Sequence, residues 1–224
     1  MNKQEMIDAI INGFHRASEE YLDWSSDQTI HDAGIEFMAC ANISRSIIEN
    51  GRTGGRNAWI YLEMPFEKIE LYSNIAVRKK GRPRAILQGS PRVDIAYFEG
   101  IGNIKGVVEV KRHLSYSNLS RNFERVCALM EKYGRPHGCL RFGCVVAIRP
   151  IKSGQRKSSF EISADIKSEF EAKYDQNITV HVKEKILNEA EDITYVTSEN
   201  DSEDDNTLVK GFSVACFYIT AEPQ

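Results

Sequence analysis

A chain of 224 residues, 42% hydrophobic and 27% charged, has the composition of a soluble globular protein large enough to form one domain. No apolar run approaches the roughly 18 residues that span a bilayer, so no membrane partner is expected. The five cysteines are odd in number and form no CxxC zinc pair, which favours a reducing, cytoplasmic location.

The formal net charge of −3 conceals an uneven distribution of charge. Residues 189–205 carry eight of the 32 acidic residues and no Lys or Arg, which predicts a solvated loop. Without this loop, 24 acidic residues face 29 basic residues, a balance of +5. Residues 77–113 hold nine basic residues against three acidic ones, a surplus that is compatible with a nucleic-acid partner.

The N-terminal part of the chain is predicted to be helical. A helix is expected over 3–22 rather than a signal peptide, because acidic residues follow the short apolar patch and no small-residue cleavage site is present. A second helix over 29–50 is expected to end at Gly51, a typical helix-stop residue. The residues AWIYLEM (58–64) then predict a first strand.

The middle of the chain combines a basic loop with a β-hairpin. The sequence RKKGRPR (78–84) predicts the loop, with short strands expected at its two ends. Two runs of β-branched and aromatic residues, 92–99 and 106–112, flank a turn over 100–105 that contains Gly and Asn. This pattern is typical of two antiparallel strands joined by a turn, so it predicts a hairpin.

Helices and strands alternate in the second half of the chain. Apolar residues at helical spacing predict a helix over 117–134. The run FGCVVAI (142–148) is typical of a fully buried strand. A more polar helix over 161–175 and strands over 178–183 and 211–219 complete the chain.

This order of elements predicts one α/β domain over residues 1–224. The order α–β–ββ–α–β over 29–150 indicates a mixed central sheet flanked by helices. An extra N-terminal helix precedes this core, and a less regular extension over 151–224 follows it.

Three charged side chains share one face of the predicted hairpin. Side chains alternate along a strand, so Glu109 and Lys111 point the same way, and Asp94 lies opposite one of them in either register. Apolar residues of both strands share this face, which disfavours the alternative of a solvent-facing ladder of ion pairs. Two buried carboxylates repel each other at a cost of several kcal/mol, and a divalent cation such as Mg²⁺ would remove that cost.

The lysine extends this interpretation to phosphodiester hydrolysis, since Lys111 can orient or deprotonate a metal-bound water and stabilise negative charge. Asp94, followed after a turn by Glu109-Val110-Lys111 on the next strand, resembles the PD-(D/E)xK nuclease superfamily, which has the restriction-endonuclease-like fold. Val93 stands where the proline of that name would be. The resemblance implies metal binding by the aspartate and the glutamate, and a catalytic lysine.

The same family often adds a glutamate from the helix before the first strand, and the resemblance covers about residues 29–150. Glu36 is the candidate, because a helical wheel places it on a stripe with Cys40 and Ile43 rather than on the polar face. Glu63 on the first strand is the rival candidate.

The sequence thus predicts a metal-dependent nuclease, most specifically a DNA endonuclease. Asp94, Glu109 and the carbonyl of Val110 would hold Mg²⁺ or Mn²⁺, Lys111 would activate water, and Glu36 would assist. The candidate nucleic-acid contacts are Lys79, Lys80, Arg82, Arg84, Arg121 and Arg125. The expected partner is double-stranded DNA, and a homodimer is left open.

Two alternatives to a nuclease remain open from the sequence. One is a catalytically inactive nucleic-acid-binding or protein-interaction module on the same scaffold, which would bind through its basic surface without any dependence on metal. The other is an interaction protein whose working surface is the acidic loop over 189–205.

Overall fold

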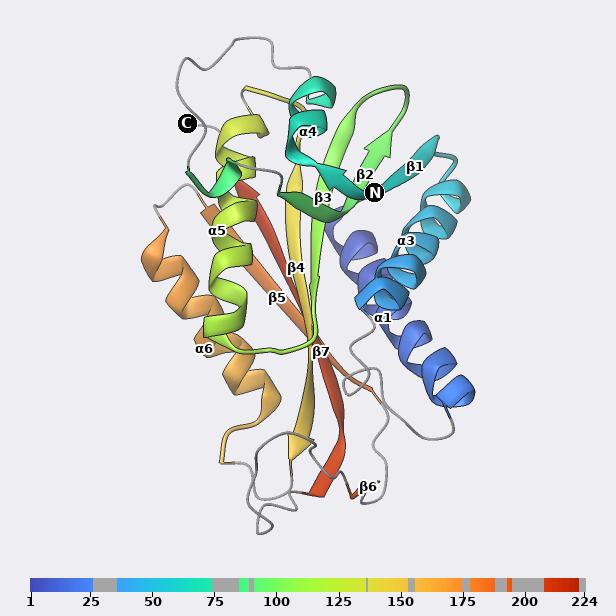
Figure 1. Ribbon diagram of the computed structural model, residues 1–224, viewed down its shortest axis with the longest axis vertical. Coiled ribbons are helices and arrows are strands. Elements are labelled where there is room, and N and C mark those ends of the chain that lie inside the picture. The colour runs from blue at the N-terminus through green and yellow to red at the C-terminus, as the bar shows by residue number, and fades with distance from the viewer. Residues whose placement is uncertain are drawn as a thin grey trace.

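The protein forms a central β-sheet with helices on both of its faces, so the predicted α/β class is confirmed (Figure 1). The computed structural model describes residues 1–25, 36–73, 85–88, 91–135, 137–152, 156–174, 178–187, 193–194 and 208–221.

Seven strands of the described part make one mixed sheet in the order β1-β2-β3-β4-β7-β5, with β6 paired to β7. Their bounds are β1 Ala58–Pro65, β2 Arg92–Glu99, β3 Ile104–Lys111, β4 Phe142–Lys152, β5 Ile178–Leu187, β6 Ile193–Thr194 and β7 Leu208–Ala221. The β3–β4 pair is parallel, and the other described pairs are antiparallel. The predicted hairpin is therefore confirmed as β2–β3.

The helices cover the two faces of the sheet. Their bounds are α1 Lys3–Ser25, α3 Glu36–Thr53, α4 Phe66–Tyr72, α5 Tyr116–Tyr133 and α6 Ser159–Lys173. Helices α1 and α3 cover one face, and α5 and α6 cover the other (Figure 1). Because side chains alternate along a strand, Val108 and Val110 pack under α1 and α3, whereas Val107 packs under α5.

Helix α3 begins, within the described residues, at Glu36 and passes through the predicted stop at Gly51. The predicted stop is wrong, and Gly51 instead allows the helix to lie close to β1. A Cβ at this position would lie 2.8 Å from the Cβ of Ala58 on β1. Gly13 on α1 allows a similar approach, since its Cβ would meet the Cα of Ile43 at 2.4 Å. Because these two glycines have no side chain, α3 packs closely against both α1 and the sheet.

The segment between β1 and β2 differs from the sequence prediction. Residues 66–72 form helix α4, which the sequence pattern did not predict. A short 3₁₀ helix, Ala85–Leu87, stands where a strand was expected after the basic loop. Proline-containing segments of this kind carry weak periodicity, so the local pattern does not separate a short strand from a helical turn. The basic loop over 78–84 lies outside the described residues.

No helix within the described residues is long and apolar enough to cross a membrane.

Candidate active site

The two hairpin strands separate at one end, and the predicted charged residues lie at this opening. The β2–β3 ladder ends at the pair formed by Ile95 and Val108. Beyond this pair, β2 stays bonded to β1, whereas β3 stays bonded to β4 as far as Lys111. We call this opening the β2–β3 fork, and it holds Asp94, Glu109 and Lys111.

Asp94 is held inside the β2–β3 fork by the backbone of β3. Its Oδ2 accepts a hydrogen bond of 2.7 Å from the backbone N–H of Val110. In a β-strand, the N–H and C=O groups of one residue are directed to the same edge, so the Val110 carbonyl is also directed to the fork. A carboxylate and a carbonyl oxygen therefore converge at this point.

Lys111 bridges two carboxylates. Its Nζ lies 3.4 Å from Asp94 Oδ2 and 3.5 Å from Glu36 Oε2. Burial opposes the charged form of the ammonium, but the negative charges of Asp94, Glu36 and Glu109 outweigh burial and raise the pKa of Lys111 above its ordinary value. The lysine is accordingly a protonated cation at neutral pH in the metal-free protein.

Glu109 is a buried carboxylate without a hydrogen-bond donor among the described residues. The residue is 0% exposed, and neither carboxylate oxygen accepts a hydrogen bond. Burial, followed by repulsion from Asp94, raises the pKa of Glu109 to about 8. Arg125 on α5 lies close by, with Nη2 3.1 Å from Glu109 Oε1, but its N–H groups are not aligned to donate to that oxygen.

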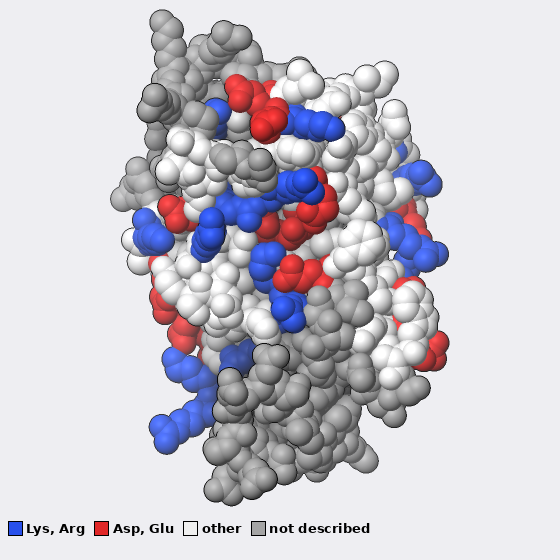
Figure 2. Space-filling model, in the orientation of Figure 1, with Lys and Arg blue, Asp and Glu red and all other residues white. Residues whose placement is uncertain are grey.

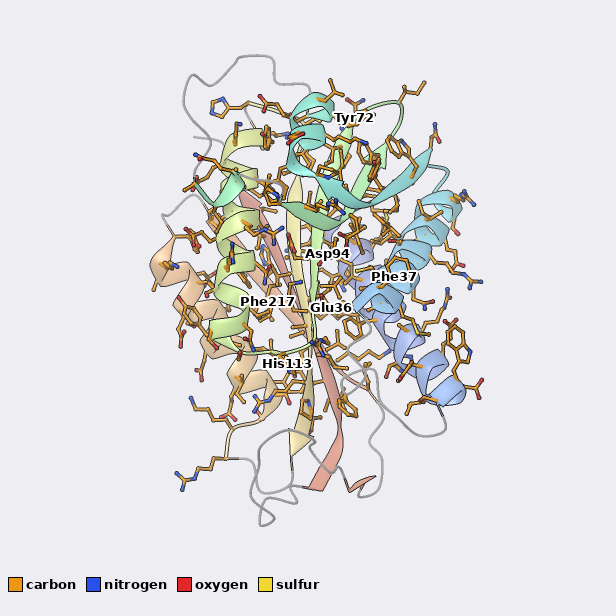
Figure 3. The ribbon with its side chains drawn as sticks, viewed as in Figure 1. Glu36, Phe37, Tyr72, Asp94, His113 and Phe217 are labelled. Atoms are coloured by element: carbon orange, nitrogen blue, oxygen red, sulfur yellow. The ribbon has the colours of Figure 1, made fainter. Side chains whose placement is uncertain are left out.

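The sequence offered two candidates for an additional site glutamate, Glu36 on the helix and Glu63 on the first strand. Glu36 is the one that contacts Lys111. It is the first described residue of α3, its side chain is 39% exposed, and it lies with Asp94 near the middle of the view in Figure 3. One turn along the helix, burial and then the charge of Asp94 raise the pKa of the Cys40 thiol above its ordinary value. Glu63 is exposed.

Glu63 nevertheless has an unusual backbone. It lies on β1 between the residues that pair with Ile95 and Val93, which sets it opposite Asp94. Its φ is 52°, a left-handed conformation that costs a non-glycine residue on the order of 1 kcal/mol. Glu63 is therefore close in the sheet to the fork, although its side chain faces solvent.

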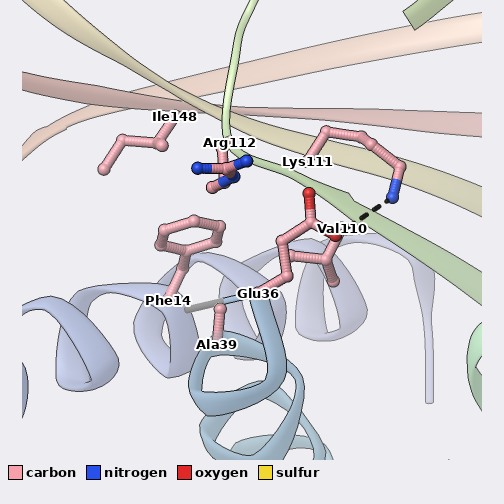
Figure 4. Close-up of a pocket in the computed structure, with 7 residues that line it drawn as sticks. All are labelled: Phe14, Glu36, Ala39, Val110, Lys111, Arg112 and Ile148. Carbon is pink, nitrogen blue, oxygen red and sulfur yellow. Dashed lines mark hydrogen bonds and ion pairs between the residues drawn. The ribbon is translucent and has the colours of Figure 1, made fainter. Parts of the chain in front are cut away.

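A small pocket adjoins the fork on the side covered by α1 and α3 (Figure 4). The pocket is open to solvent, and its empty volume, which includes part of that solvent, is about 190 Å³. The lining residues are Phe14, Glu36, Ala39, Val110, Lys111, Arg112 and Ile148. The ion pair between Lys111 and Glu36 forms part of its wall, so solvent reaches the lysine from this side.

The predicted nucleic-acid contacts separate into three groups. Arg121 is exposed on α5. Arg125, one turn later, lies against Glu109. The other four, Lys79, Lys80, Arg82 and Arg84, lie outside the described residues. Figure 2 shows acidic side chains near the middle of this face with Lys and Arg side chains around them.

The oxygen donors at the fork are of the chemical type that Mg²⁺ takes in proteins. In the ranges that the structure describes, no group of three or more His, Cys, Asp or Glu side chains is arranged to hold a metal ion. The fork instead offers Asp94, the Val110 carbonyl and the buried Glu109 carboxylate. Mg²⁺ takes few protein ligands and keeps several waters, and Mn²⁺ accepts the same oxygen donors.

The sequence pattern did not predict the contact between Arg125 and Glu109. The sequence contains one signal for it: a glutamate on a buried strand needs a cation or a proton, and α5 follows that strand directly. The helical spacing of α5 sets Arg125 close to the buried stripe that includes Val126 and Leu129, which packs on the same face of the sheet as Glu109.

Comparisons with protein-family models, curated proteins and solved structures gave no match to this chain.

Proposed function

We propose that this protein is a divalent-metal-dependent nuclease that hydrolyses phosphodiester bonds, and specifically a DNA endonuclease. The observation that carries the proposal is the buried Glu109, whose carboxylate oxygens accept no hydrogen bond from the described residues while Asp94 and Lys111 lie beside it. A buried charge without hydrogen bonds is costly unless a cation compensates it. A metal ion at the fork would compensate it and would also draw a phosphate to the site.

The topology supports a restriction-endonuclease-like core within the α/β fold. The elements α3, β1, β2, β3, α5 and β4 follow in the order that the sequence resemblance implies. Three antiparallel strands precede one parallel strand across the helix α5, and the candidate site lies where β2 and β3 separate. Helix α1 and the strands β5 and β7 would then be additions to this core.

The residues at the fork would each have a separate role in the reaction. Asp94, Glu109 and the Val110 carbonyl would hold Mg²⁺ or Mn²⁺, which when bound supplies Lewis acidity toward phosphate oxygens and a more acidic water. Lys111, protonated in the metal-free protein, would stabilise negative charge on the phosphate and orient the attacking water. Glu36 would hold the ammonium of Lys111 from the opposite side.

A cleavage assay tests the proposal directly. We expect the purified protein to cut linear, circular or branched DNA when Mg²⁺ or Mn²⁺ is present, and not in EDTA. The same cations should raise the melting temperature, because a ligand that binds only the folded state stabilises it. Asp94→Asn should abolish both the cleavage and the metal-induced shift. An unchanged metal response in this variant would contradict the assignment of the metal to the fork.

The two glutamates give a second test. We expect Glu36→Gln to lower cleavage by about tenfold or more, because the ammonium of Lys111 loses a charged partner 3.5 Å away. Glu63→Gln, a matched change on an exposed side chain beside the fork, should leave cleavage within about twofold. Parallel rates on one DNA substrate decide between them, and the reverse order of effects would assign the role to Glu63.

The contact of Arg125 with Glu109 favours one alternative, a nucleic-acid-binding module without catalysis. An arginine beside the carboxylate supplies positive charge without any metal. Such a module would bind DNA equally well in EDTA and in Mg²⁺, and it would cut none of the three DNA forms. The cleavage assay therefore separates the two functions.

A further inference from the structure

The guanidinium of Arg125 has more than one set of partners. Its side chain is 17% exposed, and Nη2 lies 3.1 Å from Glu109 Oε1. It also donates a hydrogen bond to the backbone carbonyl of Arg92 and, through Nη1 at 3.5 Å, to Asn122 Oδ1. The aromatic ring of Phe66 lies 5.3 Å from its central carbon. These neutral contacts hold the guanidinium at the fork independently of the carboxylate.

Its contact with Glu109 is electrostatic rather than a well-formed bidentate pair. Neither oxygen of Glu109 accepts a hydrogen bond, and the Nε of Arg125 is buried without an acceptor among the described residues. A strong arginine–carboxylate pair uses two parallel N–H···O bonds. When Glu109 is ionised, Arg125 therefore compensates its negative charge while leaving the carboxylate lone pairs open to another cation.

A divalent cation and a guanidinium cannot share one buried carboxylate without repulsion. At separations of a few ångströms, like charges in a partly buried site repel each other strongly. The repulsion falls if the guanidinium gains an anion of its own. A nucleic-acid phosphate bound at the fork would be such an anion, and arginine matches its geometry.

On these grounds, and resting on the proposed function, we propose that Arg125 is a substrate-binding residue that passes from Glu109 to a phosphate of the nucleic acid when a divalent cation binds Asp94 and Glu109. Arg125 then opposes metal binding in the free protein and favours it once nucleic acid is bound. Metal and nucleic acid thus bind cooperatively, and each tightens the binding of the other by the same factor.

Calorimetric titration with Mg²⁺ tests the first half of this proposal. At about pH 9, where protons compete least for Glu109, we expect Arg125→Gln to bind Mg²⁺ about fivefold or more tightly than the wild type. Arg121→Gln removes an exposed arginine one turn earlier on α5 and should leave the Mg²⁺ affinity unchanged. An equal or weaker Mg²⁺ affinity in Arg125→Gln would overturn the proposal.

Binding of a DNA duplex tests the second half. In a Lys111→Met background, which suppresses cleavage, Mg²⁺ should tighten DNA binding, and adding Arg125→Gln should remove most of that gain. In the same background, Arg121→Gln should weaken DNA binding equally with and without Mg²⁺. An undiminished Mg²⁺ effect on DNA binding in the Arg125 variant would overturn the proposal.

A measurement on the wild type covers the case in which Arg125→Gln does not fold. The Nε–H resonance of Arg125 in ¹⁵N-labelled protein, assigned by comparison with Arg125→Lys, should shift during a Mg²⁺ titration and again when DNA is added. If Asp94-dependent Mg²⁺ binding is observed but the Arg125 resonance does not shift, the inference about Arg125 is overturned and the proposed function is not. If the wild type shows no Asp94-dependent Mg²⁺ binding, the proposed function fails, and this inference fails with it.

Discussion

Replacing Lys111 with methionine is expected to lower the cleavage rate by about two to four orders of magnitude, the range for losing one acid–base or electrostatic group. Methionine keeps an unbranched side chain of similar length and removes the charge. The ammonium contacts Asp94 and Glu36, and neither contact is needed for Asp94 to keep its hydrogen bond from Val110. The variant should therefore fold, and Mg²⁺ should still raise its melting temperature.

Lys105→Met is the matched control for this experiment. Lys105 lies on the same strand, β3, at the end away from the fork, so its loss should leave cleavage unchanged. Lys111→Arg should not restore activity, because a planar, bulkier guanidinium cannot take the position of the compact ammonium between Asp94 and Glu36. Full cleavage by Lys111→Met would exclude the lysine from the chemistry and leave the fork charges as a structural ion-pair network.

Replacing Glu109 with glutamine is expected to change how stability depends on pH. The pKa of Glu109 is raised from 4.5 to about 8 in the folded protein, so the folded state holds the proton more tightly than the unfolded state. Stability must then fall as pH rises through this interval, and the whole penalty is present above it. Without metal, Glu109→Gln should be more stable than the wild type at about pH 9, on the order of a few kcal/mol, and equally stable near pH 4.

Urea unfolding of both proteins from about pH 4 to pH 9 measures this difference, since the other titrating groups are common to both. Mg²⁺ should stabilise the wild type at high pH and leave Glu109→Gln unaffected. Glu161→Gln is a control with the opposite pH dependence. The backbone N–H of Ser158 lowers the pKa of Glu161. The wild type should therefore become more stable than Glu161→Gln as pH rises through the acid range. A constant difference between wild type and Glu109→Gln at all pH values would contradict a buried, protonated Glu109.

The sequence by itself determined the order of the longer helices and strands, but not helix α4 or the 3₁₀ helix between β1 and β2, and it determined the shared face of the three hairpin charges. Both follow from local rules: periodicity separates helices from strands, and alternation along a strand puts Glu109 and Lys111 on one side whatever the register. The stripe from Glu36 to Cys40 on α3 was readable for the same reason, since residues four apart lie on one helix face.

The tertiary structure decided the features that depend on segments far apart in the chain. The ladder ending at Ile95 and Val108 created the fork and turned Asp94 toward the backbone of Val110. The approach of α3 brought Glu36 to Lys111 across 75 residues of sequence. The packing of α5 set Arg125 against Glu109. Such contacts depend on register, helix packing and side-chain burial, which local periodicity leaves undetermined because each arises from several elements at once.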